Sequence, residues 1–264
     1  YLFWSLGLLA KEQSARAADI LRRAIEERAG ANDDPTLHYY WSRALLAADR
    51  NEEALDAARH ALSLNRENAQ LAYQVTLSLY IAKRYEEAAE AARDLIDRFD
   101  EREQSDAGRL VLHAARMLLS GIAVQQHDLA TSEEWLEQVL DEFPEDVGAH
   151  NDLGYLWADE GKHLHMALAM IEHAVAAEPD NSAYRDSLGW IYHRLGRHAE
   201  AVAELEKAAT GDKPDGVMLE HLGDAAAAAG QTDKARAAWQ KALAAFEKET
   251  DAERIERVKK KLNP

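Results

Sequence analysis

The stretch that decides the fold is residues 182–215, SAYRDSLGWIYHRLGRHAEAVAELEKAATGDKPD. It holds two segments of helical period on either side of a turn signal, Gly196-Arg197. Ala201 follows Gly189 by twelve residues, and Ala208 comes seven residues after Ala201. Residues four and seven apart share one helical face, so these small side chains mark a surface that a second helix can approach closely. The stretch therefore predicts a helical hairpin.

The same pattern recurs along the chain at a nearly constant interval. The residues at the site of Ala201 follow one another at spacings of 37, 34, 44, 35, 34 and 34: Ala17, Ala54, Ala88, Ser132, Ala167, Ala201 and Ala235. The small residues at the site of Gly189 are Ser5, Ser42, Thr76, Ser120, Gly154, Gly189 and Gly223. One hairpin cannot bury both of its faces, so the hairpins must stack. We predict seven repeats, followed by a capping helix over 250–264: 1–34, 35–68, 69–112, 113–146, 147–181, 182–215 and 216–249.

This pattern resembles the tetratricopeptide repeat, a family whose unit is a helical hairpin of 34 residues. The motifs that carry the resemblance are clearest in the fifth and sixth repeats: Leu153-Gly154, Trp157, Ala167 and Pro179, then Leu188-Gly189, Tyr192, Ala201 and Ala208. The resemblance covers about residues 1–249 and is closest in the last three repeats. It implies an all-α, right-handed superhelical solenoid of about seven hairpins, whose first helices line a concave groove.

Three segments depart from the regular repeat. The polar residues that begin the stretch Glu101 to Leu112 predict a longer loop or a lengthened next helix. Thr250 to Glu253 reads as a capping box for the last helix, with an apolar stripe of Ile255, Val258 and Leu262 and with Arg254, Arg257 and Lys259 to Lys261 facing water. Tyr1 to Leu9 is apolar nearly all round, which predicts further repeats upstream or pairing with a second copy. Because the chain begins without Met, we interpret it as a fragment of a longer protein.

The composition excludes several classes of function. Lys plus Arg number 31 and Asp plus Glu 48 in 264 residues, a net charge of −17, which disfavours nucleic acid and anionic lipid as partners. The absence of Cys excludes disulfides, thiolate metal sites and Cys nucleophiles. The apolar stretch Tyr1 to Ala10 is half of the roughly 20 residues that a membrane-spanning helix needs. We predict no direct membrane insertion by this chain.

The groove positions of the family, carried over to this sequence, form two unlike halves. The N-terminal half is aromatic: Tyr39, Tyr40, Arg43, Tyr73 and Tyr80, with Phe3, Gln74 and Met117. The C-terminal half is acidic with aromatics among the acids: Asn151, Asp152, Tyr155, Asp159, Asp186, Trp190, His193, Arg194, Glu220 and Asp224. From Asp141 to Trp190 there are 11 Asp and Glu against 2 Lys and Arg, a net charge of −9 in 50 residues. An acidic surface favours a basic or neutral ligand, and the alternative is that these acids are only solvated.

Residues that could carry chemistry do not form a recognisable site. Gly154 and Gly161-Lys162 have the wrong spacing for a phosphate-binding loop. His163 and His165 could share a metal with His150 or His198, but no third ligand is set by local spacing. Ser187, Asp186 and His193 cannot converge from one helix. The groove also lacks the several cations with which chaperone-tail-binding members of the family clamp a carboxylate, since only Arg43 and Arg194 are cationic. We predict no enzyme, no catalytic residue, no metal and no cofactor.

The sequence therefore predicts a scaffold or adaptor that binds a protein or an extended peptide in its groove. A self-association module of a larger protein and, more remotely, a substrate-presenting region of an enzyme stay open as alternatives. The run from Leu153 through Asp186 and Trp190 to Asp224 is also similar to envelope proteins of Gram-negative bacteria. Several of these are lipoproteins, and some are adaptors for a carboxy-terminal processing protease. This narrower resemblance implies the periplasmic side of a bacterial envelope, with the cytoplasm as the alternative.

Overall fold

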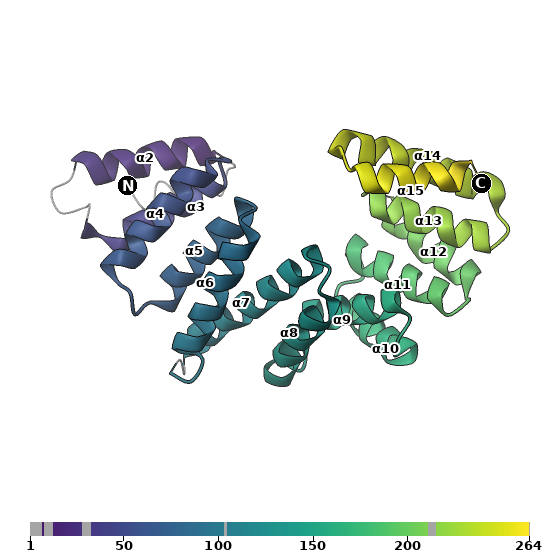
Figure 1. Ribbon diagram of the computed structural model, residues 1–264, viewed down its shortest axis with the longest axis horizontal. Helices are drawn as coiled ribbons and strands as arrows, with labels where there is room; N and C mark the ends of the chain where they lie inside the picture. The colour runs from purple at the N-terminus through teal and green to yellow at the C-terminus, as the bar shows by residue number, and fades with distance from the viewer. Residues whose placement is uncertain (1–6, 8–12, 28–32, 103–104, 211–214, 264) are drawn as a thin grey trace. The chain divides into compact units, whose positions relative to one another are not determined.

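The computed structural model describes residues 7, 13–27, 33–102, 105–210 and 215–263 (Figure 1). Within these ranges the chain forms fourteen α-helices and no strand. The chain divides into two compact units, Tyr1–Trp135 and Leu136–Pro264, and α8 (Leu129–Glu142) crosses the limit between them. The helices of unit 1 are α2 (Ser14–Glu27), α3 (Pro35–Leu46), α4 (Asn51–Leu64), α5 (Ala69–Ile81), α6 (Tyr85–Phe99) and α7 (Asp106–Gln125). Those of unit 2 are α9 (Val147–Glu160), α10 (Leu164–Ala177), α11 (Ser182–Arg194), α12 (His198–Ala208), α13 (Gly216–Ala228), α14 (Thr232–Glu249) and α15 (Ala252–Leu262).

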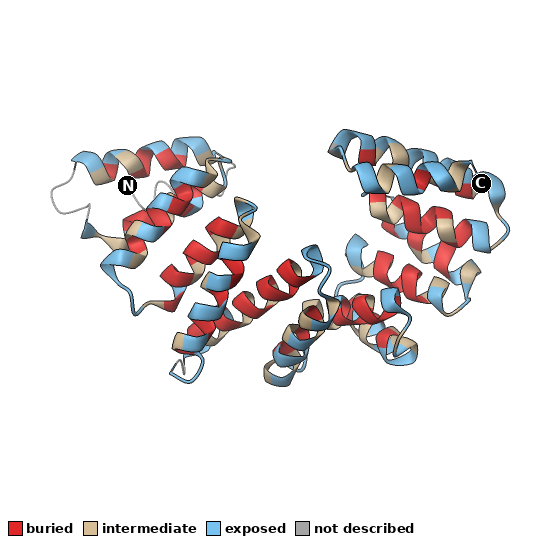
Figure 2. Cartoon of the chain, in the orientation of Figure 1, coloured by how far each residue is buried: buried red, intermediate tan, exposed pale blue. Residues whose placement is uncertain are grey.

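In both units the helices pair into hairpins that stack. In unit 1, α3 packs on α4 and α5 on α6, while α3 also contacts α5 and α5 contacts α7. In unit 2, α9 packs on α10, α11 on α12 and α13 on α14, and the first helices α9, α11 and α13 contact one another in that order. Figure 2 shows buried residues along the sides where helices meet. The all-α solenoid class is confirmed, and the repeat limits and the division at 249/250 stay predictions.

Small residues allow the two helices of a hairpin to approach closely. A Cβ atom built on Gly189 would lie 2.4 Å from Leu205 Cγ and 3.1 Å from the carbonyl oxygen of Ala201. At Gly154 the nearest atom would be Ile171 Cγ1, at 2.8 Å. At the same site in repeat 4, the hydroxyl oxygens of Ser120 and Ser132 lie 2.9 Å apart and are buried. The small residues of the repeat are therefore required by packing.

The turn inside each hairpin uses the left-handed backbone conformation at the fifteenth residue of the repeat. Gly occupies this position in three repeats and an L-residue in three others, with φ between 57° and 77°: Asp49, Lys83, His127, Gly161, Gly196 and Gly230. The inserted residue of repeat 5 is accommodated in the same turn, because His163 is also left-handed with φ 51°. Gly161, whose spacing from Gly154 superficially resembles a phosphate-binding loop, therefore ends α9 and forms part of the turn.

We expect the substitution Lys83→Gly to stabilise unit 1 by about 0.5 kcal/mol. The left-handed conformation costs an L-residue roughly 1–2 kcal/mol, and the greater freedom of Gly in the unfolded chain offsets part of the relief. The measurement is urea unfolding followed by circular dichroism, with Lys83→Ala as the control that keeps the backbone strain. A Gly variant no more stable than the Ala variant would contradict the expectation.

The segment after repeat 3 lengthens the next helix. Ser105 caps α7, its hydroxyl accepting the N–H of Gly108 at 3.1 Å, and the helix then runs for 20 residues. Of the two predicted forms, the lengthened helix is the one found. Within the described residues α7 is the helix that is long and apolar enough to cross a membrane, and 56% of its apolar stretch is buried inside the fold, as is usual for a core helix.

The predictions for the two ends have different outcomes. The apolar stripe of the last helix is confirmed, because Val258 is fully buried and Ile255 and Leu262 pack beside it. The cap is Asp251 and not Thr250: the Asp251 carboxylate accepts the N–H of Arg254, while Thr250 is left-handed at the end of α14. The stretch Tyr1 to Leu9, apart from Gly7, lies outside the described residues, and the self-association alternative that depends on it stays a prediction.

Candidate binding surface

The predicted groove residues of unit 1 form an aromatic surface around one arginine. Tyr39 and Tyr40 on α3 meet edge to face, with ring centroids 5.0 Å apart. The guanidinium carbon of Arg43 lies 5.6 Å from the Tyr39 centroid and 6.0 Å from that of Tyr40. Both rings are half-buried and Arg43 is exposed, so this cluster combines apolar area with one solvated cation.

On α5 the predicted residues are more deeply embedded. Tyr73 and Tyr80 are half-buried and pack against the core of unit 1. Burial raises the pKa of the Tyr73 phenol above its ordinary value. Gln74 is buried and donates its amide to the Ser42 hydroxyl at 2.9 Å, so it holds α5 against α3. Phe3 lies outside the described residues.

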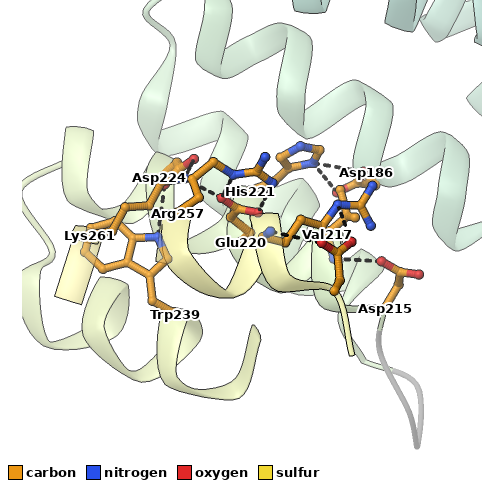
Figure 3. Close-up of polar contacts among 11 residues, drawn as sticks. Asp186, Asp215, Val217, Glu220, His221, Asp224, Trp239, Arg257 and Lys261 are labelled. Atoms are coloured by element: carbon orange, nitrogen blue, oxygen red, sulfur yellow. Dashed lines mark hydrogen bonds and ion pairs between the residues drawn. The ribbon is translucent and has the colours of Figure 1, made fainter. Parts of the chain in front are cut away.

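In unit 2 the centre of the predicted acidic half is a buried aspartate–histidine pair. Nδ1 of His221 on α13 donates to Asp186 on α11, at 3.0 and 3.1 Å from the two carboxylate oxygens (Figure 3). Trp190 stacks on the His221 ring with centroids 4.2 Å apart, and His193 stacks on Trp190 at 5.1 Å. Asp186 is 7% exposed and Trp190 9%, so these two groove candidates belong to the interior of the fold.

Glu220 and Asp224 on α13 are matched by the last helix. The Arg257 guanidinium donates two hydrogen bonds of 2.7 Å to the Glu220 carboxylate (Figure 3). Lys261 Nζ lies 2.7 Å from both Glu220 and Asp224, and Trp239 Nε1 donates to Asp224 at 3.0 Å. Arg257 was expected to face water, and its side chain is 46% exposed while it also pairs with Glu220. Lys261 was expected to face water too, and it is instead half-buried between the two acids. The charge that α13 was expected to offer a ligand is largely neutralised within the chain.

These contacts change the ionisation of Glu220. Burial by itself would raise the pKa of its carboxyl, but the hydrogen bonds and charges of Arg257 and Lys261 outweigh burial and lower that pKa below its ordinary value. Glu220 therefore stays ionised at neutral pH although its side chain is 4% exposed.

The first helix of unit 2, α9, differs from α11 and α13 in keeping acids that no cation matches. Asp152 and Asp159 are exposed, and neither forms an ion pair within the described ranges. Although the Asp152 carboxylate reaches solvent, the protein packed around it removes part of its hydration, and this raises its pKa against the effect of a hydrogen bond from Asn151. Tyr155 lies between the two acids on the same helical face. Burial, then the charges of Asp159 and Asp186, raise the pKa of its phenol.

The remaining candidates lie beside the Trp190 stack. Arg194 is exposed, with its guanidinium carbon 5.8 Å from the Trp190 centroid. Its Nη2 lies only 2.8 Å from where a Cβ of Gly161 would be, so Arg194 spans from α11 to the turn that ends α9. Burial, then the nearby His198, lowers the pKa of His193.

Two of the histidines that were candidate metal ligands contact other rings. His150 contacts His173, with ring centroids 4.7 Å apart, and His163 contacts Trp157 at 5.0 Å. Within the part of the chain that the structure describes, no three His, Asp or Glu side chains are placed to hold a metal ion.

Sequence reasoning missed His221, Arg257 and Lys261. A signal for them exists: each donor lies between 35 and 41 residues after the acid it serves, which is one repeat and a few residues further. Opposite charges one repeat apart at neighbouring positions could have indicated these pairs.

Stacked helical hairpins define the class of a helical-repeat protein. Comparisons identify the family. The tetratricopeptide repeat family matches residues 165–217. A 105-residue segment, 40% of this chain, is 36% identical to TPR repeat-containing protein PA4667 of Pseudomonas aeruginosa, and it spans 18% of that protein's length. These matches, together with the stacked hairpins, support a tetratricopeptide repeat protein. Proteins of this family are generally interaction scaffolds without catalysis, and they bind other proteins or peptides.

Solved structures show the same fold at low identity. A tetratricopeptide repeat protein from Parabacteroides merdae is 16% identical, with a TM-score of 0.70 over 97% of this chain and 96% of that one. The crystal structure of the APC/C hetero-tetramer Cut9-Hcn1 gives a TM-score of 0.76 at 13% identity, over 98% of this chain and 48% of that one. YrrB, described as a TPR protein with an unusual peptide-binding site, gives 0.51 at 19% identity, over 72% of this chain and 91% of that one. At these identities the likeness concerns the fold alone.

Proposed function

We propose that the chain is a scaffold or adaptor that binds a basic or neutral segment of a partner protein along its first helices. The observation that carries this proposal is the α9 face of unit 2, where exposed Asp152 and Asp159 flank the half-buried Tyr155. Aromatic rings supply contact area at low entropic cost, and unmatched carboxylates favour cationic groups. YrrB is described as having a peptide-binding site, which supports this mode of use in the same fold.

The aromatic surface of unit 1 is proposed as a second contact region for the partner protein. Tyr39, Tyr40 and Arg43 are accessible and carry one positive charge, so they suit apolar, aromatic or acidic side chains. The two units thus offer different chemistries to a partner.

A photo-crosslinking experiment tests this proposal. The full-length protein would carry benzoylphenylalanine at Tyr40 or Tyr155 on first helices, or at the control position Met166 on the second helix α10, where the residue is 58% exposed. After irradiation in a lysate of the cells that make the protein, we expect one shared adduct from Tyr40 and Tyr155 and none from Met166. The adduct should weaken as salt rises, since screening reduces attraction between exposed charges. Adducts that come from Met166 and not from the first helices would overturn the proposal.

A further inference from the structure

The hairpin of α3 and α4 contains a cavity of about 330 Å³ that is open to solvent. The described residues that line it are His38 and Trp41 on α3 and Glu53, Asp56, Ala57 and His60 on α4. The groove candidates of α3, which are Tyr39, Tyr40 and Arg43, are not among these lining residues. The cavity is therefore a separate surface from the one on which the proposed function rests.

Three of the lining residues carry aromatic rings that lie close together. His38 is 3% exposed, and the centre of its ring is 4.3 Å from that of His60 and 6.0 Å from that of Trp41. Trp41 is half-buried, and its only polar side-chain atom, Nε1, is buried. The accessible part of the Trp41 side chain is therefore aromatic carbon, and the π electrons of an indole attract a cation.

Two carboxylates complete the lining, and only one of them is matched by a cation. Glu53 accepts two hydrogen bonds from the Arg50 guanidinium, at 2.8 and 2.6 Å. Asp56 lies three residues after Glu53 and four before His60, on the same face of α4. It is exposed, and within the part of the chain that the structure describes no cation pairs with it. The cavity thus combines three rings with one uncompensated negative charge.

The hollow depends on the small side chain of Ala57. Repeat 5 has the same pair of histidines in ring contact, His150 and His173, with centroids 4.7 Å apart. At the site of Ala57, three residues after the small residue that begins the second-helix stripe, repeat 5 has the long side chain of Met170. The sequence of repeat 2 therefore leaves a space where repeat 5 places a methionine.

In repeat 6 the chain supplies a cation at the corresponding place. Arg185 stands at the site of His38 and Glu204 at the site of Ala57, counted from the predicted repeat starts. The Arg185 guanidinium donates to the Glu204 carboxylate at 2.8 Å, and the two side chains are 21% and 15% exposed. A hairpin of this fold thus accommodates a positive charge between its two helices, and repeat 2 has the acid without the cation.

We infer that the cavity of repeat 2 is a binding site for an alkylated ammonium group, which would lie against the Trp41 ring with its charge balanced by Asp56. A quaternary ammonium has no N–H donor to leave unpaired, so rings and one carboxylate satisfy it. A guanidinium prefers the two oxygens of one carboxylate, and those of Glu53 are already taken by Arg50. Ligand sites run from about 300 to 1,000 Å³, so a cavity of this size suits a compact head group.

The test compares choline with 3,3-dimethylbutanol, which has the same shape and no charge. Each would be titrated into the 264-residue chain while the tryptophan indole signals are followed by nuclear magnetic resonance. We expect choline to shift the Trp41 signal saturably and to bind about tenfold more tightly than the neutral alcohol. Equal binding of the two compounds, or no saturable shift with choline, would overturn the site.

A matched pair of charge variants locates the cation. Asp56→Asn should weaken choline binding about fivefold and leave the neutral alcohol unchanged, because only the charge is removed. Glu90→Gln is the control, since Glu90 is the exposed acid at the same position of repeat 3, where Ala72 and Val75 replace the two α3 rings. It should change choline binding by less than about twofold. Equal losses in the two variants would mean a general attraction by acidic charge and would overturn the site.

Two further variants test the cavity itself. Ala57→Met, which introduces the residue of repeat 5, should fill the space and abolish binding of both compounds. Trp41→Leu should remove the preference for choline over the neutral alcohol. Circular dichroism melting curves confirm that each variant is folded before its affinity is compared. Undiminished choline binding by a folded Ala57→Met variant would show that choline binds elsewhere, which overturns the inference.

The ammonium group could belong to a free small cation or to a methylated lysine of a partner protein, and one more titration separates these sources. A short peptide with trimethyllysine that binds more tightly than choline would assign the site to a partner, and the reverse order would assign it to a free cation. Failure of all these titrations would leave the scaffold proposal standing, because the crosslinking positions Tyr40 and Tyr155 lie outside the cavity.

Discussion

The substitution Gly189→Ala is expected to destabilise unit 2 by about 2 kcal/mol, although alanine is intrinsically the better helix former by about 1 kcal/mol. The new methyl group would lie 2.4 Å from Leu205 Cγ and 3.1 Å from the backbone oxygen of Ala201. The Leu205 side chain is fully buried, and the backbone oxygen is part of α12. The helices must therefore separate, which costs contacts along the whole hairpin.

Gly121 on α7 provides the matched control for this prediction. It is also a helical glycine, but the nearest atom to an added Cβ is the Tyr80 hydroxyl at 3.8 Å, an ordinary contact distance. Gly121→Ala should accordingly stabilise the protein by about 0.5–1 kcal/mol. The measurement is guanidinium unfolding followed by far-ultraviolet circular dichroism. If both variants shifted stability in the same direction, the close approach at Gly189 would not be the decisive feature.

Removing the two cations at Glu220 is expected to have the largest effect, a loss of about 3 kcal/mol for the double variant Arg257→Ala with Lys261→Ala at pH 7. The Glu220 carboxylate would remain buried without its donors, and its desolvation would then be uncompensated. The added substitution Glu220→Leu should restore most of the stability, because replacing a buried ionic group by an apolar one of similar volume is often close to neutral. A triple variant as unstable as the double one would show that α15 is held by other contacts.

The pH dependence of this effect follows from the lowered pKa of Glu220. A carboxyl whose pKa is lower in the folded than in the unfolded chain contributes stability above the unfolded value of about 4.3, and this contribution is lost as pH falls through the folded value. In the double variant, burial without cations favours protonation instead. The difference in unfolding free energy between wild type and double variant should therefore be greatest at neutral pH and shrink below about pH 5. A difference that stays constant with pH would contradict an electrostatic origin.

The helix starts have local causes. The Asp34 carboxylate, directly before Pro35, accepts the N–H of Thr36 at the start of α3, and the Asp146 carboxylate accepts the N–H of Ala149 at the start of α9. The cap of α15 was placed one residue too early, since Thr250 and Asp251 are both good capping residues and only the left-handed turn at Thr250 separates them. A choice between adjacent caps depends on how the preceding helix ends.

The candidate groove residues could be assigned to first helices from the sequence, but the sequence could not separate those with a charged partner in the chain from those without one. Asp152 and Asp186 are both acids near the start of a first helix, with Asn151 directly before the one and Ser187 directly after the other. One is exposed without a cationic partner among the described residues, and the other is buried against His221. No local property of the two stretches distinguishes these environments.

The amino-acid sequence by itself determined the hairpins, their repeat and the sign of the charge on the first helices. These depend on spacings within one helix or one turn, where neighbouring residues impose their own geometry. Only the tertiary structure decided which acids stay unmatched, because Asp186, Glu220 and Asp224 meet their donors only when successive helices stack. Charge pairing over one repeat and the desolvation of each carboxylate are properties of the assembled stack, and the free acids of α9 are those that the stack leaves without a cation.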